Sequence, residues 1–281
     1  MIIAGFDGSA AARAAVEWAA DDALRLAMPL RIVHAVDRWP YQNATFPPQE
    51  WPDTMIRAGE KLLAEAEAVA RTREPAVTVD TRLVQGAPAA VLLEAAGEAA
   101  EIVVGSRGLG GFAGALIGSV SMHVADQAAC PVIVIRGEQG PVRGEIVVGV
   151  DDASDCGPAL AYAFEQAALR GSTLRAIHAW QLPTPMYSPA LARDLDDLRA
   201  SQLQLVTEAI AVYRDKHPDV RVIKDVRQVH PVEALTEASA QADLVVVGSH
   251  SRNALERVLL GSVSRGVLHH AHCPVAVVRT A

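Results

Sequence analysis

The chain has 281 residues, 51% hydrophobic and 21% charged, with a formal net charge of -8 at pH 7. Its length and composition predict globular structure, with about two domains as the prior. The acidic balance disfavours nucleic acid or an anionic membrane as the main partner, because both bind basic surfaces. The sequence has neither an apolar run near the roughly 20 residues of a membrane helix nor a signal-peptide pattern, so we expect a cytoplasmic protein.

The first half alternates short β-branched runs with longer segments rich in Ala, Leu and Glu. In chain order, the expected strands are Ile2–Phe6, Leu30–Val36, Val77–Leu83, Ile102–Val104 and Val132–Ile135. The expected helices are Ala11–Leu26, Asp53–Arg73, Pro88–Gly97 and Leu116–Ala128. Strands separated by helices predict a parallel sheet, and runs such as IVVG, apolar on both faces, indicate helices on both sides of it.

The second half repeats the first, block by block and in the same order. IIAGFDGS matches IVVGVDDAS, EIVVGSRG matches DLVVVGSHS, and ACPVIVIR matches HCPVAVVR. Asp7 lies 144 residues before Asp151, and Gly105 lies 143 residues before Gly248. A nearly constant offset between matching blocks indicates a duplicated domain.

The repeat predicts the domain organisation. We expect one domain at residues 1–137, a linker at 138–144 and a second domain at 145–281. The fold class is α/β, with two tandem open parallel sheets of Rossmann-like type and helices on both faces of each.

A glycine-rich segment, GSRGLGGFAGALIGS, follows the fourth expected strand of the first copy. Its spacing is Gly105-x2-Gly108-x9-Gly118-Ser119. In open parallel sheets ligands bind beyond the carboxyl ends of the strands, where glycine lets the backbone approach phosphate and a helix N-terminus attracts anions. Ser119 or Ser121 can add a hydroxyl near the helix start. The segment predicts a site for a triphosphate.

The common phosphate-binding motifs do not fit this segment. A Walker loop needs a lysine, and neither copy of the loop has one; the dinucleotide fingerprint belongs after the first strand, where this chain has GFDGSAAAR. The structural alternative is a flexible connector between strand and helix.

The repeated unit resembles the universal stress protein family, whose nucleotide-binding members carry G-x2-G-x9-G-[ST] after the fourth strand. The resemblance includes an Asp ending the first strand, a VHAV-like end to the second strand and a closing CPVxVxR strand, and it covers the whole chain twice. It implies ATP as the ligand, with a divalent metal ion such as Mg²⁺, an Asp at the adenine or ribose and glycines and serines at the phosphates.

The resemblance also implies the positions that bind the nucleotide. In the first copy they are Asp7, Ala35, Gly105, Gly108, Gly118, Ser119, Val120 and Ser121. In the second copy they are Asp151, Ala179, Gly248, Ser251, Gly261, Ser262, Val263 and Ser264.

The second copy departs from the pattern at Ser251, where the first has Gly108. A side chain there opposes close backbone approach if the position needs a positive φ. Asp152 and Asp155 add negative charge beside Asp151, although Arg252 or Arg257 could neutralise phosphate. We therefore expect two sites of unequal quality, with the first the stronger.

Other conspicuous residues have structural interpretations. We expect Ser9 to cap the first helix, with Asp7 as the alternative cap, and His34 and His178 to pack or make local hydrogen bonds. Cys130 and Cys273 are expected to be buried free thiols. The HHAHC cluster near the end of the chain spans a helix end and a strand start, which disfavours zinc.

These observations predict an ATP-binding stress-response regulatory protein that acts through nucleotide-linked conformation or association. The alternatives are a partner-binding scaffold with one or both sites empty and a slow ATPase or related enzyme. The resemblance implies pairing of Val132–Ile135 with Val275–Val278 in an internal pseudo-twofold dimer. A homodimer and a further protein partner are also expected.

Overall fold

The computed structural model describes residues 1–37, 53–109, 117–136, 140–151, 156–181, 191–249 and 260–279, with backbone only at residues 53 and 191–195. The chain forms two compact units, Met1–Gln139 and Gly140–Ala281. Among the described residues, no helix is both long and apolar enough to cross a membrane.

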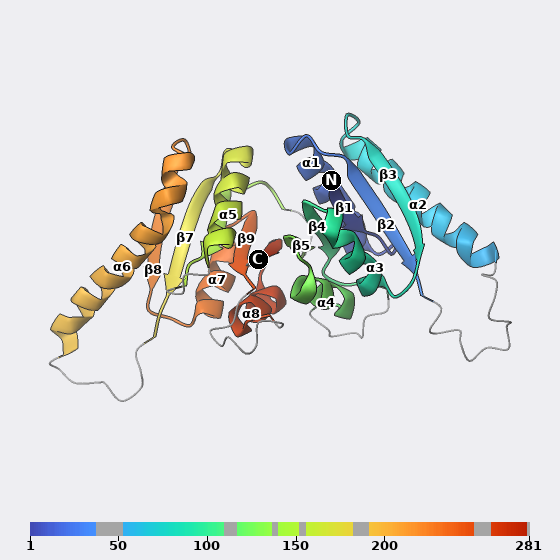
Figure 1. Cartoon of the computed structure of the whole chain (residues 1–281). Helices are drawn as coiled ribbons and strands as arrows, with labels where there is room; N and C mark the ends of the chain where they lie inside the picture. Colours follow the sequence, from blue (N-terminus) through green and yellow to red (C-terminus); the bar gives the residue numbers. More distant parts are fainter. Residues whose placement is uncertain are drawn as a thin grey trace. The chain divides into compact units, whose positions relative to one another are not determined.

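The first unit alternates strands and helices from end to end (Figure 1). Its elements are β1 (Ile2–Gly5), α1 (Ala10–Arg25), β2 (Leu30–Val36), α2 (Asp53–Arg73), β3 (Val79–Gln85), α3 (Pro88–Ala95), the short 3₁₀ helix η2 (Ala96–Glu98), β4 (Glu101–Gly105), α4 (Ser119–Gln127) and β5 (Val132–Ile135).

The second unit repeats this alternation. Its elements are β6 (Glu145–Gly149), α5 (Gly157–Arg170), β7 (Thr173–Ala179), α6 (Leu191–Lys216), β8 (Val222–Arg227), α7 (Pro231–Ser239), β9 (Leu244–Gly248), α8 (Ser262–His270) and β10 (Val275–Val278).

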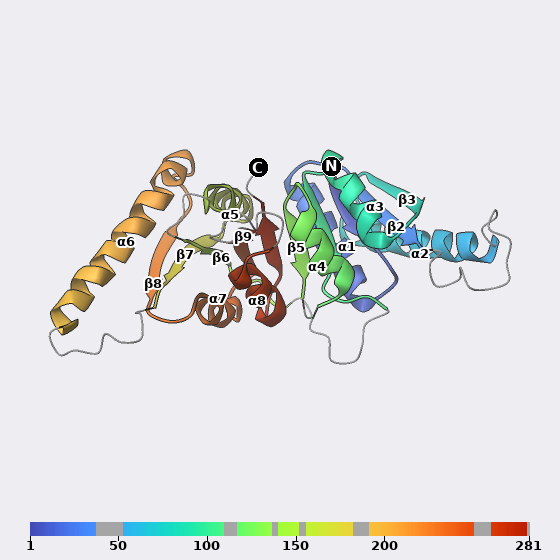
Figure 2. The same cartoon turned by 60° about the horizontal axis from the view of Figure 1, so that its bottom comes forward.

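The strands of each unit pair in parallel. The order within the first unit is β3-β2-β1-β4-β5, and within the second it is β8-β7-β6-β9-β10. In the second unit, α5 and α6 lie on one face of the strands and α7 and α8 on the other (Figure 2). The expected α/β class is confirmed; the pairing of the two CPV strands stays a prediction.

Burial along β1 shows why both faces of its sheet need helices. Ile2 and Ile3 are consecutive, point to opposite faces and are each 0% exposed. Such strands carry continuous apolar sequence, and this let the sequence locate β5, whose four residues are all buried, at its observed bounds.

Two elements of the first unit begin more than one residue later than the sequence predicts. β3 begins at Val79, because the N–H of Val77 bonds to the carbonyl of Glu74 in the turn after α2 and so leaves the strand ladder. α4 begins at Ser119, because Gly118 is extended (φ −77°, ψ 153°) and its N–H donates to the Ser106 carbonyl. Hydrogen bonding in the preceding turns thus makes both elements begin later than the apolar pattern indicated.

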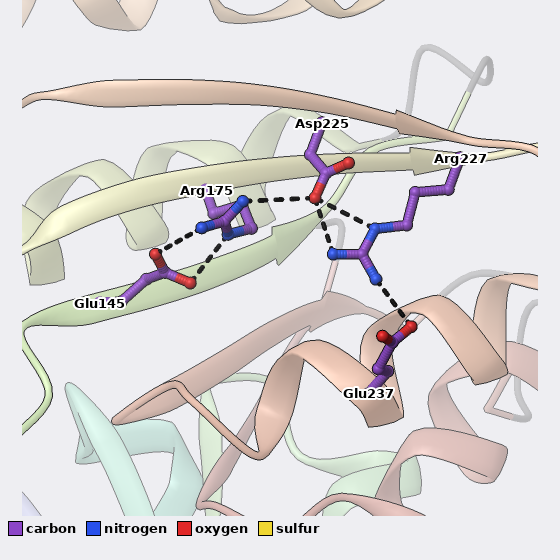
Figure 3. A network of polar contacts seen from close by, with 5 residues as sticks. All are labelled: Glu145, Arg175, Asp225, Arg227 and Glu237. Carbon is purple, nitrogen blue, oxygen red and sulfur yellow. Dashed lines mark hydrogen bonds and ion pairs between the residues drawn. The ribbon is translucent and has the colours of Figure 1, made fainter.

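A chain of ion pairs crosses one face of the second sheet (Figure 3). Arg175 donates to both carboxylate oxygens of Glu145 at 2.8 and 2.9 Å and lies 3.4 Å from Asp225. Asp225 also accepts from Arg227 at 2.8 Å, and Arg227 reaches Glu237 of α7 at 3.1 Å. These contacts join three strands and a helix.

The first unit contains a shorter version of this chain. Arg31 donates to Asp80 at 2.8 Å, Arg82 contacts the same carboxylate at 3.3 Å, and Arg31 lies 3.7 Å from Glu98. The duplication thus copied a polar contact across strands that local sequence pattern did not reveal.

Candidate functional site

A cavity of about 260 Å³ opens at the carboxyl ends of β1, β2 and β4 in the first unit. β1 lies between β2 and β4, so the chain connections on its two sides run in opposite directions across the sheet. Open α/β sheets bind ligands at such a switch point. The residues implied by the resemblance come together here: Asp7, Ala35, Gly105, Gly108, Gly118, Ser119, Val120 and Ser121 all line the cavity.

The cavity also has lining residues that the sequence did not single out for the site. These are Gly5, Phe6, Ala12, Val33, His34, Pro88, Leu92, Val104 and Arg107. Pro88 and Leu92 are four residues apart on α3 and so share one helix face. This spacing indicates that the two side chains lie together, but the sequence does not show that their face of α3 covers the sheet beside the cavity.

Asp7 connects the turn after β1 to the loop after β4. Its carboxylate accepts hydrogen bonds from the backbone N–H of Ser9 at 3.0 Å and of Leu109 at 3.1 Å. The Ser9 hydroxyl donates to the Arg107 carbonyl at 3.2 Å and accepts from the Ala12 N–H at 3.1 Å. The expectation that Ser9 caps α1 is confirmed, and the same residue also holds the glycine loop.

Two of the three motif glycines are required by close packing. A Cβ on Gly108 would lie 2.4 Å from Oδ2 of Asp7, and a Cβ on Gly105 would lie 2.6 Å from the backbone of Ala11. At Gly118 the nearest atom would be the Ser106 carbonyl oxygen at 3.5 Å, an ordinary contact. Packing within the protein therefore does not explain Gly118, whose lack of a side chain leaves room for a ligand to approach the backbone.

The N-terminus of α4 borders the cavity, since Gly118 and the first three helical residues line it. Gly118 is the N-cap and makes no side-chain cap, and Ser119, the first helical residue, is exposed. Ser121 is buried and its hydroxyl donates to the Gly105 carbonyl at 2.6 Å. The hydroxyl hydrogen of Ser121 is thus used within the protein, which leaves Ser119 as the exposed donor.

The two strand-end histidines make equivalent hydrogen bonds. Nδ1 of His34 lies 2.7 Å from the Phe6 carbonyl, and Nδ1 of His178 lies 2.9 Å from the Val150 carbonyl. Because a carbonyl only accepts, Nδ1 carries the hydrogen in both rings. The expected local hydrogen bonds are confirmed.

The base of the corresponding loop in the second unit is built in the same way. The N–H of Gly261 donates to the Ser249 carbonyl at 3.0 Å, and the Ser264 hydroxyl donates to the Gly248 carbonyl. Gly261 is the N-cap of α8, which begins at Ser262.

The rest of the predicted second site is described in part. Asp151 follows β6 and is exposed, Ala179 ends β7, and Val263 lies in the first turn of α8. β6 lies between β7 and β9, as β1 lies between β2 and β4. Ser251, Arg252, Arg257, Asp152 and Asp155 lie outside the described residues.

Cys130 and Cys273 are buried free thiols, as the sequence predicts. Burial raises the pKa of the Cys130 thiol to about 11 and that of Cys273 to about 12. These thiols are therefore protonated at neutral pH and chemically inert. No three His, Cys, Asp or Glu side chains within the described ranges lie close enough to hold a metal ion.

Comparison with known proteins agrees with this architecture. A model described as the universal stress protein family matches residues 1–136 and 143–279. Two proteins of Mycobacterium tuberculosis named as universal stress proteins are 36% and 34% identical to this chain, covering 99% of it and 96% and 94% of their own lengths. A universal stress protein of Archaeoglobus fulgidus has a similar solved structure, with a TM-score of 0.75 and 18% identity over 100% of this chain and 96% of that one.

The last similarity concerns the fold alone, whereas the family match and the two relatives extend over both units. The chain therefore belongs to the universal stress protein family, with two copies of the family's domain in tandem.

Proposed function

We propose that the first unit binds ATP and that the protein is a nucleotide-dependent regulator in the stress response. One observation carries the proposal: eight positions chosen from sequence, spread over β1, β2, the loop after β4 and the start of α4, line a single cavity at the switch point of the sheet. That cavity combines apolar residues such as Phe6 and Leu92 with a glycine-bordered helix N-terminus.

The two sides of the cavity suit the two ends of an adenine nucleotide. Ala35 belongs to β2, on one side of β1, and its neighbourhood of apolar strand ends fits a base. Gly118 and Ser119 belong to the β4 side, where backbone N–H groups and a hydroxyl fit phosphate oxygens. Arg107 supplies a positive charge on that side. Mg²⁺ would accompany the ATP, since it is held chiefly by phosphate oxygens and water.

The lining favours binding over rapid hydrolysis. Phosphoryl transfer to water needs a group that orients or deprotonates the water. The ionisable side chains among the described lining residues are Asp7, His34 and Arg107. Asp7 accepts two backbone N–H groups and His34 donates through Nδ1 to a carbonyl, so both are held by the protein. We expect at most slow turnover.

The regulatory effect follows from linkage. The Asp7 contacts hold the loop after β4 to the turn after β1, and a nucleotide that binds between them favours one loop arrangement over others. Association with a second copy or with another protein in the cytoplasm would then respond to ATP. The second unit contributes a weaker site.

Gly118→Ala tests the proposal. The added methyl group makes only ordinary contacts in the free protein, so folding and melting temperature should be preserved. We expect about one tightly bound ATP per wild-type chain by calorimetry, at least about tenfold weaker binding in Gly118→Ala, and unchanged binding in the control Gly97→Ala, where a Cβ meets nothing within 4 Å.

If this protein purifies without bound nucleotide and ATP does not raise its melting temperature, it is an empty scaffold, and the proposal is contradicted. cAMP provides a further comparison, because it lacks the β- and γ-phosphates. Binding of cAMP as tight as that of ATP would refute the role of the helix N-terminus in holding a triphosphate.

A further inference from the structure

The second unit has an open groove between α7 and α8. Its lining residues are not among the positions of the predicted nucleotide site at the carboxyl ends of β6 and β9. It is lined by His230, Val232, Glu233, Thr236, Gly266, His270 and His272. Three of these side chains are imidazoles, contributed by the N-cap of α7, the last turn of α8 and the segment before β10. His230, His270 and His272 are all exposed.

The duplicated first copy shows that the fold itself does not require these histidines. At an offset of 143 residues, the equivalents of His230, His270 and His272 are Ala87, Gln127 and Ala129. The same offset pairs Glu233 with Ala90 and Thr236 with Leu93. Polar substitutions have thus gathered on one surface of the second copy.

The helix pair is also reshaped around the groove. Gly266 stands in the interior of α8, where the first copy has His123. A Cβ on Gly266 would lie 2.6 Å from Cγ2 of Val232, so α7 and α8 approach closely at this point. The glycine thus makes room for Val232, where the first copy has the smaller Ala89.

The hydrogen bond at the start of α7 decides which chemistry His230 offers. Its Nδ1 accepts from the N–H of Val232 at 3.3 Å. A neutral ring that accepts at Nδ1 carries its hydrogen on Nε2 and therefore presents a donor outward. A metal at Nε2 would need the opposite tautomer, so His230 cannot ligate a metal there while it caps α7.

The other polar groups agree with a ligand rich in acceptor oxygens. The N-terminus of α7, nine residues long, is attractive to anions. Thr236 lines the groove, and its Oγ1 is buried with no hydrogen-bond partner in the described part of the chain. The imidazoles are too widely spaced for one ion, since no three such ligands among the described residues could hold a metal.

We infer that this groove is a second anion-binding site, which takes a phosphate-type ligand with several oxygens through His230, His270 and His272. Each imidazole donates a hydrogen bond to a different oxygen of the ligand. Glu233 also lines the groove, and its negative charge opposes the anion. The inference is independent of nucleotide binding in the first unit.

The test follows the histidine ring signals of the full-length protein by NMR during titration with inorganic pyrophosphate at pH 7. We expect saturable shifts of the His230, His270 and His272 signals. His272→Ala, which restores the residue of the first copy, should weaken the affinity reported by His230 and His270 about tenfold. Glu233→Gln should strengthen it, and His123→Gln, an exposed histidine in the first unit, should leave it unchanged.

Three results would overturn the inference. Shifts that rise without saturation and are equal in His272→Ala indicate non-specific screening. Weaker pyrophosphate binding in Glu233→Gln contradicts the opposing role of that carboxylate. Saturable binding of ZnCl₂ that is lost in Glu233→Gln, without pyrophosphate binding, identifies a metal site instead.

Discussion

Oδ2 of Asp7 accepts a hydrogen bond of 3.1 Å from the backbone N–H of Leu109, 102 residues away in the chain. This contact holds the glycine loop to the turn after β1 at the mouth of the proposed nucleotide cavity. The Leu109 side chain is 74% exposed, so packing of that side chain contributes little to holding the loop. The carboxylate of Asp7 is therefore a main determinant of the loop position.

Asp7→Ala should loosen this loop. Loss of one hydrogen bond to a carboxylate at a partly exposed site costs about 1 kcal/mol, or roughly fivefold faster amide exchange at Leu109. Hydrogen exchange measured by NMR checks this, with Asp7→Asn as an intermediate variant, because its one amide oxygen can accept from only one of the two N–H groups that the carboxylate holds. Equal exchange rates at Leu109 in wild type and Asp7→Ala would show that the contact does not hold the loop.

Gly108→Ala should disturb the same contact from the other side. Its Cβ would lie 2.4 Å from Asp7 Oδ2, so the carboxylate or the loop must move. We expect at least about tenfold weaker ATP binding with a loss of stability of about 1–3 kcal/mol. Calorimetry and thermal melting measure the two effects. The double variant Asp7→Ala/Gly108→Ala should recover stability relative to Gly108→Ala, and a further loss would contradict the clash.

Ser251→Gly should improve the second site. Ser251 occupies the position of Gly108 in the repeat, and the first unit shows that this position tolerates no Cβ beside a strand-end Asp. We expect ATP stoichiometry by calorimetry to rise from about one toward two per chain. The control is Gly118→Ala combined with Ser251→Gly, in which ATP should bind tightly only at the second site. A stoichiometry that does not change would assign the weakness to other residues.

The three cysteines should differ in reactivity. The pKa values of about 11 and about 12 for Cys130 and Cys273 leave little thiolate at pH 8, whereas Cys156 is partly exposed. We expect one fast thiol per chain with DTNB and at least roughly hundredfold slower reaction of the other two. Cys156→Ser should abolish the fast phase. Two fast thiols in the native protein would mean that the strand-start cysteines open to solvent.

Asp225→Asn should destabilise the second unit in a pH-dependent way. Burial by itself raises the pKa of Asp225, but hydrogen bonds and charges of Arg227 and Arg175 outweigh it, so the net pKa is lowered. A lowered folded-state pKa contributes stability above the ordinary value of about 3.9 and loses it as pH falls through the folded-state value.

The deficit of Asp225→Asn should therefore be present at pH 7 and shrink below about pH 4. Its size at pH 7 should be about 1 kcal/mol, or roughly 3–5 °C in Tm for a domain of this length, since the pair is only partly buried. Asp80→Asn in the first unit is the matched control, because its side chain is 47% exposed and its effect should be smaller. A pH-independent deficit would assign the loss to packing.

The sequence by itself determined the repeat and the α/β class, and its resemblance to the universal stress protein family supplied the positions that meet at the first cavity. These features follow from local pattern: apolar runs locate strands such as β5, and a glycine loop after a strand lies at the ligand-binding end of a parallel sheet. The exact spacing of Gly105, Gly108 and Gly118 then selected the loop without knowledge of its shape.

Only the tertiary structure decided what the individual residues do there. At Gly108 the Asp7 carboxylate leaves no room for a side chain, whereas Gly118 has room for one. The tertiary structure also joined Asp7 to Leu109 and Arg175 to Asp225, and gathered the histidines of the second unit along one groove. These contacts connect residues far apart in the chain, and they depend on strand order and helix packing, which local periodicity does not encode.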